Sequence, residues 1–350
     1  MKATNRLNNI ISDNPELLKI MVHDSKKVKN IYQPGHYWII KTKSAISQIK
    51  KYGLNNFRGM TNGIGTSYAD NFYADIRVNY GYGIKYLIVK IFSNIYPFNK
   101  FFNSQIQLTI NYLKEVSIYK NFLFKNNKRV TFLLSKYNLS FDTTRGGCLS
   151  FGKFNGLNIS YHYLQLLDSL DRLNQMINIR KCKTFLEIGG GFGVNTHLSI
   201  ELFKIKKIIY VDISPNLYVA TQYLRSFYGN SVIDYKKCKD MKEIKFSSTN
   251  KLEIFCIAPH QIKKIRSEID FFHNANSFIE MPENAVKNYA KEIEEIMSDT
   301  GVISLISYGE FDLSNTIHPE KLPRFFKKSA IKKIYPSLSP LCFYYYFIIR

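Results

Sequence analysis

Short apolar runs alternate with amphipathic stretches through the second half of the chain. Each run spans only a few residues and is rich in Ile, Val and Phe, which is typical of strands buried on both faces of a parallel sheet. The pattern predicts five such strands, at 185–188, 208–212, 252–257, 269–274 and 301–308.

Helical spacing fills the segments between and before these runs. Tyr163, Leu166, Leu167, Leu170 and Leu173 form one apolar stripe, and Ser160 is placed to cap that helix. Further helices are expected at 195–203, 261–268 and 282–297, and a closing hairpin at 331–335 and 342–349. The order predicts a Rossmann-like doubly wound α/β sheet with an antiparallel edge.

The first part of the chain carries no motif that can be tied to chemistry. Short helices are expected at 16–22 and 45–52. We therefore predict a mostly helical N-terminal extension or cap over residues 1–135, and a ligand-binding α/β domain over 136–350.

Charge changes this picture little. The chain has 350 residues and a formal charge of +22, which invites a nucleic-acid or anionic-membrane interpretation. Its lysines, however, occur in small scattered clusters together with many Asn, Ile, Tyr and Phe residues. We expect no specific nucleic-acid partner. The same charge favours an anionic acceptor and is compatible with peripheral contact with an anionic membrane.

Cysteine usage and hydropathy indicate the compartment. The five cysteines are scattered and never spaced as Cys-x-x-Cys, which argues against a disulfide framework or a zinc site. No apolar run approaches the ~20 residues of a membrane span, and the polar start lacks a signal-peptide core. The sequence predicts a cytoplasmic protein without a transmembrane segment.

A glycine-rich turn follows the first predicted strand. Its pattern is Glu-x-Gly-x-Gly-x-Gly, with Glu187 ahead of Gly189, Gly190, Gly191 and Gly193. Such a turn allows a ligand to touch the backbone. The dinucleotide fingerprint would need glycine at position 194, where this chain has Val194. A nucleotide-like ligand other than NAD(P) is therefore expected.

A carboxylate ends the second strand. Asp212 lies about 20 residues after the glycine turn, which suits a bidentate hold on ribose hydroxyls. The alternative is an Asp that only caps the turn before Ser214 and Pro215, the expected start of the next helix.

These features resemble the sugar O-methyltransferases found with bacterial surface-polysaccharide genes, which belong to the Rossmann-like class I enzymes dependent on S-adenosylmethionine. The resemblance rests on Phe-Leu-Glu-Ile-Gly-Gly-Gly-Phe-Gly at 185–193, Ile-Tyr-Val-Asp-Ile at 209–213, and Asn-Ser-Phe-Ile-Glu-Met-Pro at 276–282, within roughly 158–308. It implies S-adenosylmethionine as cofactor and a sugar or glycan acceptor, nucleotide- or lipid-linked or polymer-bound. The residues that it places at the cofactor are Glu187, Gly189, Gly190, Gly191, Gly193, Asp212, Ile213, Pro259, His260 and Asn276.

Methyl transfer to a sugar hydroxyl needs a base, or a metal that acidifies the hydroxyl. Glu280 fits the base or a metal ligand at the expected cleft, and its alternative role is to favour the N-terminus of the following helix. His273 is a second catalytic candidate, although a buried core histidine is the alternative. Arg145 and Tyr308 are the substrate candidates. No ligand set in the sequence indicates a metal.

Two other functions compete with sugar methylation. An RNA methyltransferase suits the charge, but the Asn/Asp-Pro-Pro-aromatic tetrad of base-amino methyltransferases is missing after the fourth strand. A non-catalytic scaffold with the same fold would predict decay of the glycine loop or of Asp212, and both are intact.

Overall fold

The computed structural model describes residues 10–59, 95, 127–141, 143–148, 151–154, 156–307, 317–328, 330–334 and 344–349. The chain divides into two compact units. One consists of Met1–Lys43 and Gln165–Arg350, and the other of Ser44–Leu164.

An eight-stranded sheet in the order β5-β6-β4-β3-β7-β8-β10-β9 forms the centre of the first unit. Neighbouring strands from β5 to β8 are parallel, and β10 is antiparallel to both β8 and β9. This is the doubly wound α/β sheet predicted from the sequence, which is confirmed. The strands are β3 (Thr184–Ile188), β4 (Lys207–Val211), β5 (Val232–Ile233), β6 (Glu253–Ile257), β7 (Ile269–Ala275), β8 (Met297–Ser307), β9 (Ala330–Ile334) and β10 (Tyr344–Ile349).

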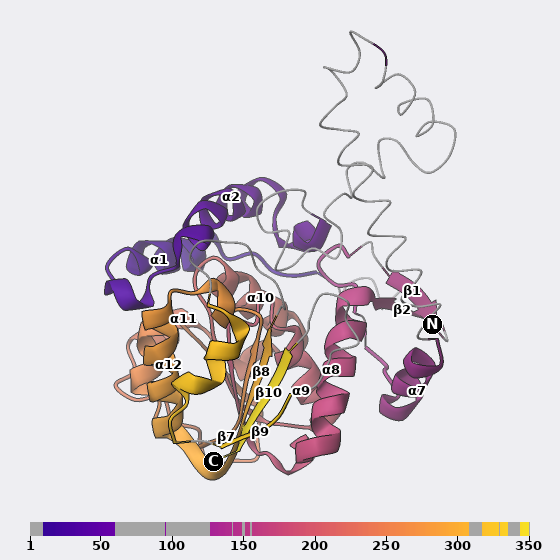
Figure 1. The fold of residues 1–350 in the computed structure, drawn as a ribbon. Coiled ribbons are helices and arrows are strands. Elements are labelled where there is room, and N and C mark those ends of the chain that lie inside the picture. Colours follow the sequence, from indigo (N-terminus) through magenta and orange to yellow (C-terminus); the bar gives the residue numbers. More distant parts are fainter. Residues whose placement is uncertain are drawn as a thin grey trace. The chain divides into compact units, whose positions relative to one another are not determined.

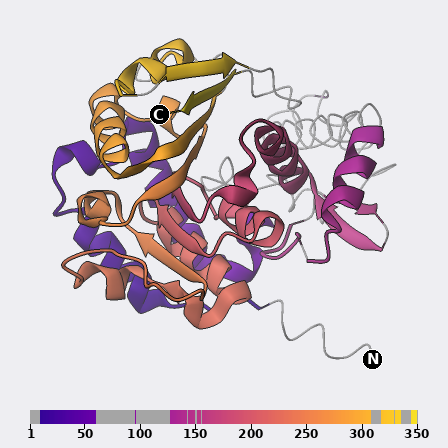
Figure 2. The ribbon, with the colours of Figure 1, turned by 90° about the horizontal axis from the view of Figure 1, so that it is seen from below.

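Helices cover both faces of this sheet, with α8 and α9 on one side and α11 and α12 on the other (Figure 1 and Figure 2). The apolar face of α12 supplies Val286, Tyr289 and Ile293 to the core, as its spacing predicts. The elements that connect or cover the strands are α8 (Tyr161–Ile177), η4 (Ile179–Lys181), α9 (Val194–Phe203), α10 (Asn216–Tyr228), η5 (Gly229–Ser231), α11 (Tyr235–Lys239), η6 (Pro259–Lys264), η7 (Phe278–Glu280), α12 (Glu283–Ile296) and η8 (Pro319–Phe325).

Several element boundaries test the sequence predictions locally. Ser160 does cap α8, because its Oγ accepts a hydrogen bond of 3.2 Å from the Tyr163 N–H. The predicted start of α10 at Pro215 is one residue early, since Pro215 is the N-cap and the helix begins at Asn216. The segment expected to be a helix at 261–268 is not an α-helix: the 3-10 helix η6 ends at Lys264, and Ile265 pairs with Ile244 in an isolated bridge.

The N-terminal segment is helical, as predicted, and lies over the carboxyl ends of the parallel strands (Figure 1). It comprises α1 (Pro15–Ser25), η2 (Asn30–Tyr32) and the first turns of α2 (His36–Tyr52). Three tyrosines of the rest of this unit, Tyr218, Tyr235 and Tyr289, contact it. Tyr218 accepts from the Asn14 N–H at 2.7 Å, Tyr235 donates to Asp24 at 3.1 Å, and the rings of Tyr32 and Tyr289 meet edge to face at 6.3 Å.

The second unit contains η3 (Leu54–Gly59), α7 (Asn127–Tyr137), and a hairpin of β1 (Phe151–Phe154) and β2 (Leu157–Ser160), in a stretch that the sequence analysis leaves without strands. A fully buried arginine, Arg58, connects its loops. Its guanidinium donates to the Thr143 carbonyl at 2.5 Å and to the Ser160 hydroxyl at 2.9 Å. Across both units, no helix in the described ranges is long and apolar enough to cross a membrane.

Candidate functional site

The glycine turn lies at the point where the strand order reverses. The chain leaves β3 toward β4 on one side, and β7 later returns to the other side of β3. Ligands of open α/β sheets bind in the crevice at such a point, beyond the carboxyl ends of the strands. The loop after β3 and the loop after β7 therefore form the two walls of the candidate site.

Gly189 marks the contact between these two walls. Its φ of +70° lies in the left-handed region, and a Cβ there would overlap the Ser277 side chain, which follows β7. The same Cβ position is 3.7 Å from the Met281 methyl group. Only glycine can occupy this position. Because Ser277 and Met281 pack against it, the segment around Glu280 lies next to the glycine loop.

Glu187 supports the loop from beneath. Its carboxylate is fully buried and accepts hydrogen bonds from Asn195 Nδ2 at 3.0 Å and Thr196 Oγ1 at 2.6 Å. It also accepts from the Thr196 backbone, and Gly193, the N-cap of α9, has no side chain for this task. Burial raises the pKa of Glu187 to about 7, although these hydrogen bonds lower it. Glu187 therefore holds the first turn of α9, and a direct contact with a cofactor stays a prediction.

Asp212 connects the end of β4 to the glycine loop. Its Oδ2 accepts from the Gly191 N–H at 3.2 Å and from the Tyr210 hydroxyl at 2.9 Å, and its Oδ1 accepts from the Ile213 N–H at 2.7 Å. Burial raises its pKa to about 7 against the lowering effect of these donors. Tyr210 carries no motif signal of its own, but its spacing of two residues places it on the same strand face as Asp212.

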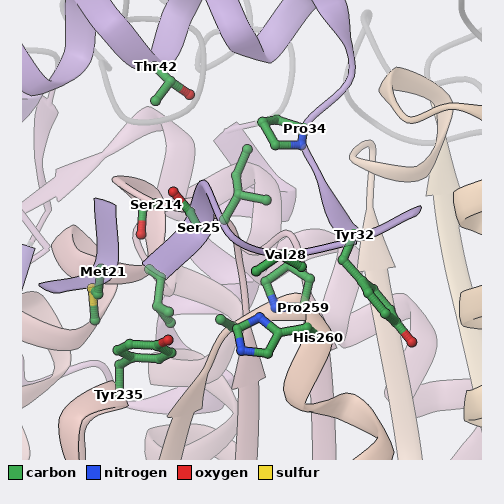
Figure 3. Close-up of a pocket in the computed structure, with 13 residues that line it drawn as sticks. Met21, Ser25, Val28, Tyr32, Pro34, Thr42, Ser214, Tyr235, Pro259 and His260 are labelled. Carbon is green, nitrogen blue, oxygen red and sulfur yellow. The ribbon is translucent and has the colours of Figure 1, made fainter. Parts of the chain in front are cut away.

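A pocket opens beyond the ends of β4 and β6, and Figure 3 shows the residues around it. Three of the predicted residues, Ile213, Pro259 and His260, line it. Burial lowers the pKa of His260, whose ring meets that of Tyr235 at 6.4 Å. The remaining lining residues from the sheet unit's core are Ser214, Leu217, Tyr235 and Ala258, and those from the N-terminal segment are Met21, Ser25, Val28, Tyr32, Pro34 and Thr42.

The loop after β7 contains the other predicted residues of the cleft. Asn276 has a φ of +66° and its N–H donates to the Ile306 carbonyl at 2.8 Å. Glu280 ends η7 and is half-buried, and its Oε2 accepts a hydrogen bond of 2.9 Å from the indole Nε1 of Trp38. Burial raises the pKa of Glu280 to about 7. The N-cap of α12 is Pro282, so Glu280 has no capping hydrogen bond to that helix.

His273 lies within the sheet. It is fully buried in β7, and its Nδ1 is 3.0 Å from the Ser304 hydroxyl of β8. Burial lowers its pKa to about 3, so the ring is neutral at physiological pH. This environment is that of a core histidine, and a catalytic role for His273 stays a prediction.

The remaining candidates are placed as follows. Arg145 belongs to the second unit, where its carbonyl accepts from Arg58 at 3.2 Å. Tyr308 lies outside the described residues. Within the described ranges, no group of three or more His, Cys, Asp or Glu side chains could hold a metal ion.

Trp38 is the residue at this site that sequence reasoning missed most clearly. It is the single tryptophan of the chain and lies 242 positions from Glu280. No local pattern connects two residues so far apart, and only the packing of the N-terminal segment brings them together.

No protein-family model matches the chain, and no curated protein matches it in sequence. Several solved structures are similar to the chain at low identity and low TM-score. The pyocyanin biosynthetic protein PhzM is 13% identical with a TM-score of 0.39, and the match covers 54% of this chain and 57% of PhzM. A methyltransferase from Clostridium acetobutylicum that depends on S-adenosylmethionine is 12% identical with a TM-score of 0.37, over 55% and 92% of the two chains.

A third structure, of a point mutant of MtNAS, is 12% identical with a TM-score of 0.40, over 90% of this chain and 98% of that one. The chain thus spans little more than half the length of PhzM and almost the whole length of MtNAS. At these TM-scores and identities the likenesses carry no conclusion about activity.

Proposed function

We propose that the chain is an S-adenosylmethionine-dependent methyltransferase that transfers the methyl group to a hydroxyl oxygen. The observation that carries the proposal is the joint geometry of the glycine loop and Asp212. The glycine loop lies at the reversal of strand order, and the Asp212 carboxylate, which accepts from the Gly191 N–H at 3.2 Å, follows β4 directly next to a pocket beyond the ends of β4 and β6. This is the place and the chemistry that an adenosyl group requires.

The hydrogen bonds that Asp212 already accepts leave capacity for a ribose hydroxyl. A carboxylate oxygen can accept about two hydrogen bonds, and Oδ1 of Asp212 accepts one, from the Ile213 N–H. A ribose hydroxyl could donate to Oδ1 without displacing any hydrogen bond of the protein. The pocket beside it, lined by Leu217, Ala258 and Pro259, suits an adenine ring.

When bound, S-adenosylmethionine would supply a methyl group already activated by its sulfonium. The chain then has to hold the acceptor in line, exclude water and take the proton of the attacking hydroxyl. We assign the last task to Glu280, which belongs to the loop that packs on the glycine turn. A carboxyl with a pKa near 7 is a suitable base at physiological pH, because it is partly ionised and still binds a proton well.

We further propose that the acceptor is a sugar hydroxyl of a bacterial surface polysaccharide or of its nucleotide- or lipid-linked precursor. Three features support this acceptor. Residues 276–282 resemble the matching stretch of the sugar O-methyltransferases, and an alkyl hydroxyl needs a base such as the one that we assign to Glu280. The net charge of +22 favours an anionic carrier group. An RNA acceptor would lack the first of these features.

Calorimetric titration with S-adenosylhomocysteine tests the cofactor. We expect micromolar affinity for the native chain, and a loss of about 10–100-fold in Asp212→Asn, because hydrogen bonds to a charged carboxylate disappear. Asp299→Asn is the matched control, since Asp299 is exposed near the opposite end of β8. Absence of binding at millimolar ligand, in a protein shown to be folded, would overturn the proposal and favour a non-catalytic scaffold.

The acceptor is tested separately, by measuring S-adenosylhomocysteine release with nucleotide-activated sugars and with RNA transcripts. We expect turnover with a sugar substrate only. Turnover with RNA alone would retain the methyltransferase and refute the sugar acceptor.

A further inference from the structure

Glu280 is held by one side chain from the other end of the chain. The indole Nε1 of Trp38 donates to Oε2 at 2.9 Å, and no other described side chain has a hydrogen bond to this carboxylate. We propose that Trp38 is a positioning residue: it fixes Oε2 of Glu280 and leaves Oε1 as the atom that takes the proton of the acceptor hydroxyl. This inference rests on the proposed role of Glu280 as the base.

The backbones of the two residues are fixed to each other as well. Trp38 lies in the first turn of α2, where its N–H donates to the Gly35 carbonyl at 2.9 Å. A Cβ on Gly35 would be 3.1 Å from Pro282 Cδ and 3.4 Å from the Glu280 carbonyl oxygen. The N-terminal segment therefore packs directly on the turn that carries Glu280, and the indole reaches the carboxylate from a fixed support.

Indole chemistry suits this task. The ring has one donor and no acceptor, so it binds either form of the carboxyl group through an oxygen and cannot itself take the proton. A hydrogen bond to the ionised form lowers the pKa of Glu280, and so does the charge of Lys41, which lies 5.9 Å from the centre of the Trp38 ring. Among the described residues, α2 thus presents Trp38 and Lys41 to the carboxylate, and no ionisable group of η7 or α12 acts on it.

The transfer can be written with its atoms balanced. The acceptor oxygen forms the new bond to the methyl carbon, the bond from sulfur to that carbon breaks, and its electron pair stays on sulfur. The hydroxyl proton moves to Oε1 of Glu280 and then to water. Trp38 retains its own proton throughout and keeps Oε2 from turning toward the acceptor.

Because Trp38 is the single tryptophan, its indole N–H gives one signal in an NMR spectrum of protein labelled with ¹⁵N-tryptophan. We expect this signal to move with pH in the ligand-free protein, with a midpoint near 7, as Glu280 ionises. Glu280→Gln should abolish the titration. Glu283→Gln is the matched control and should leave it unchanged, because Glu283 pairs with Lys287 at 2.6 Å on the exposed side of α12.

Two further variants separate positioning from mere structural support. Gly35→Ala should weaken the indole hydrogen bond and reduce the amplitude of the titration, because the added methyl group presses on Pro282. Trp38→Phe should keep S-adenosylhomocysteine affinity within about twofold, since Trp38 does not line the pocket, while the acidic limb of the rate profile moves to higher pH.

The outcomes distinguish the two proposals. An indole signal that does not move between pH 5 and 9, or that titrates equally in Glu280→Gln, would overturn the positioning role even if S-adenosylhomocysteine binds. A normal titration without any S-adenosylhomocysteine binding would overturn the proposed function: the hydrogen bond between Trp38 and Glu280 would stand, but there would be no base for it to position.

Discussion

Three carboxyl groups at the candidate site, those of Glu187, Asp212 and Glu280, have a pKa near 7, but their surroundings differ. Glu187 and Asp212 are buried, and each accepts hydrogen bonds from several groups of the loop, strand or helix beside it. Glu280 is half-buried and has a single hydrogen-bond donor, Trp38, among the described residues.

The difference indicates which carboxylate can do chemistry. A carboxylate whose oxygens are engaged by its own structure holds that structure in place, as Glu187 does for α9. A carboxylate with an oxygen left for an incoming hydroxyl can bind substrate or take a proton. The same pKa therefore accompanies two different roles, and the hydrogen bonds rather than the pKa separate them.

The largest expected effect is on the rate, at Glu280. Glu280→Gln should lower methyl transfer by about 10²–10⁴-fold, because the base is lost, while S-adenosylhomocysteine affinity changes little. Single-turnover assays beside calorimetry measure the two quantities. A variant that retains full rate would show that another group takes the proton.

The next effect is on binding, at the contact between the walls. Gly189→Ala adds a methyl group against Ser277 at a φ of +70°, which should cost about 100-fold in S-adenosylhomocysteine affinity. Gly53→Ala is the control, since its φ is +67° and nothing lies within 4 Å of its Cβ position. Equal losses of S-adenosylhomocysteine affinity in both variants would show that backbone strain, and not the contact with Ser277, causes the effect.

A smaller effect on stability is expected at Glu187. Glu187→Gln places an amide donor against the donors of Asn195 and Thr196 and should lower the free energy of unfolding by about 1–3 kcal/mol. Urea denaturation measures it. Glu295→Gln, at a largely exposed position of α12, should change stability by less than about 0.5 kcal/mol.

The smallest expected effect is the change with pH of the difference in stability between Glu187→Gln and the native chain. The native Glu187 carboxyl keeps its proton up to about pH 7, whereas the unfolded one releases it near pH 4.5. Between these values the native state binds more protons, so the contribution of Glu187 to stability falls as pH rises. The destabilisation by Glu187→Gln should shrink from pH 5 to pH 8. Because burial lowers the pKa of His273, the contribution of this residue to stability rises with pH. It is the same in the variant and in the native chain, so it cancels when the two are compared at each pH.

The sequence predicted the parts of this molecule whose signals are local. The strand runs, the capping of α8 by Ser160 and the buried face of α12 follow from spacing within a few residues. The roles of individual site residues were less accessible. The motif contains Glu187 both when this residue contacts a ligand and when it supports α9, so the motif does not distinguish the two roles. The hydrogen bonds of Glu187 with Asn195 and Thr196 are visible only in the tertiary structure.

What the sequence determined by itself is the doubly wound sheet and the glycine turn after β3, because hydrophobic periodicity and glycine spacing act over short distances along the chain. The tertiary structure alone decided that the N-terminal segment lines the pocket, and that Trp38 meets Glu280 across 242 positions. Contacts between distant segments depend on how complete elements pack, and no periodicity in one segment encodes its partner in the other.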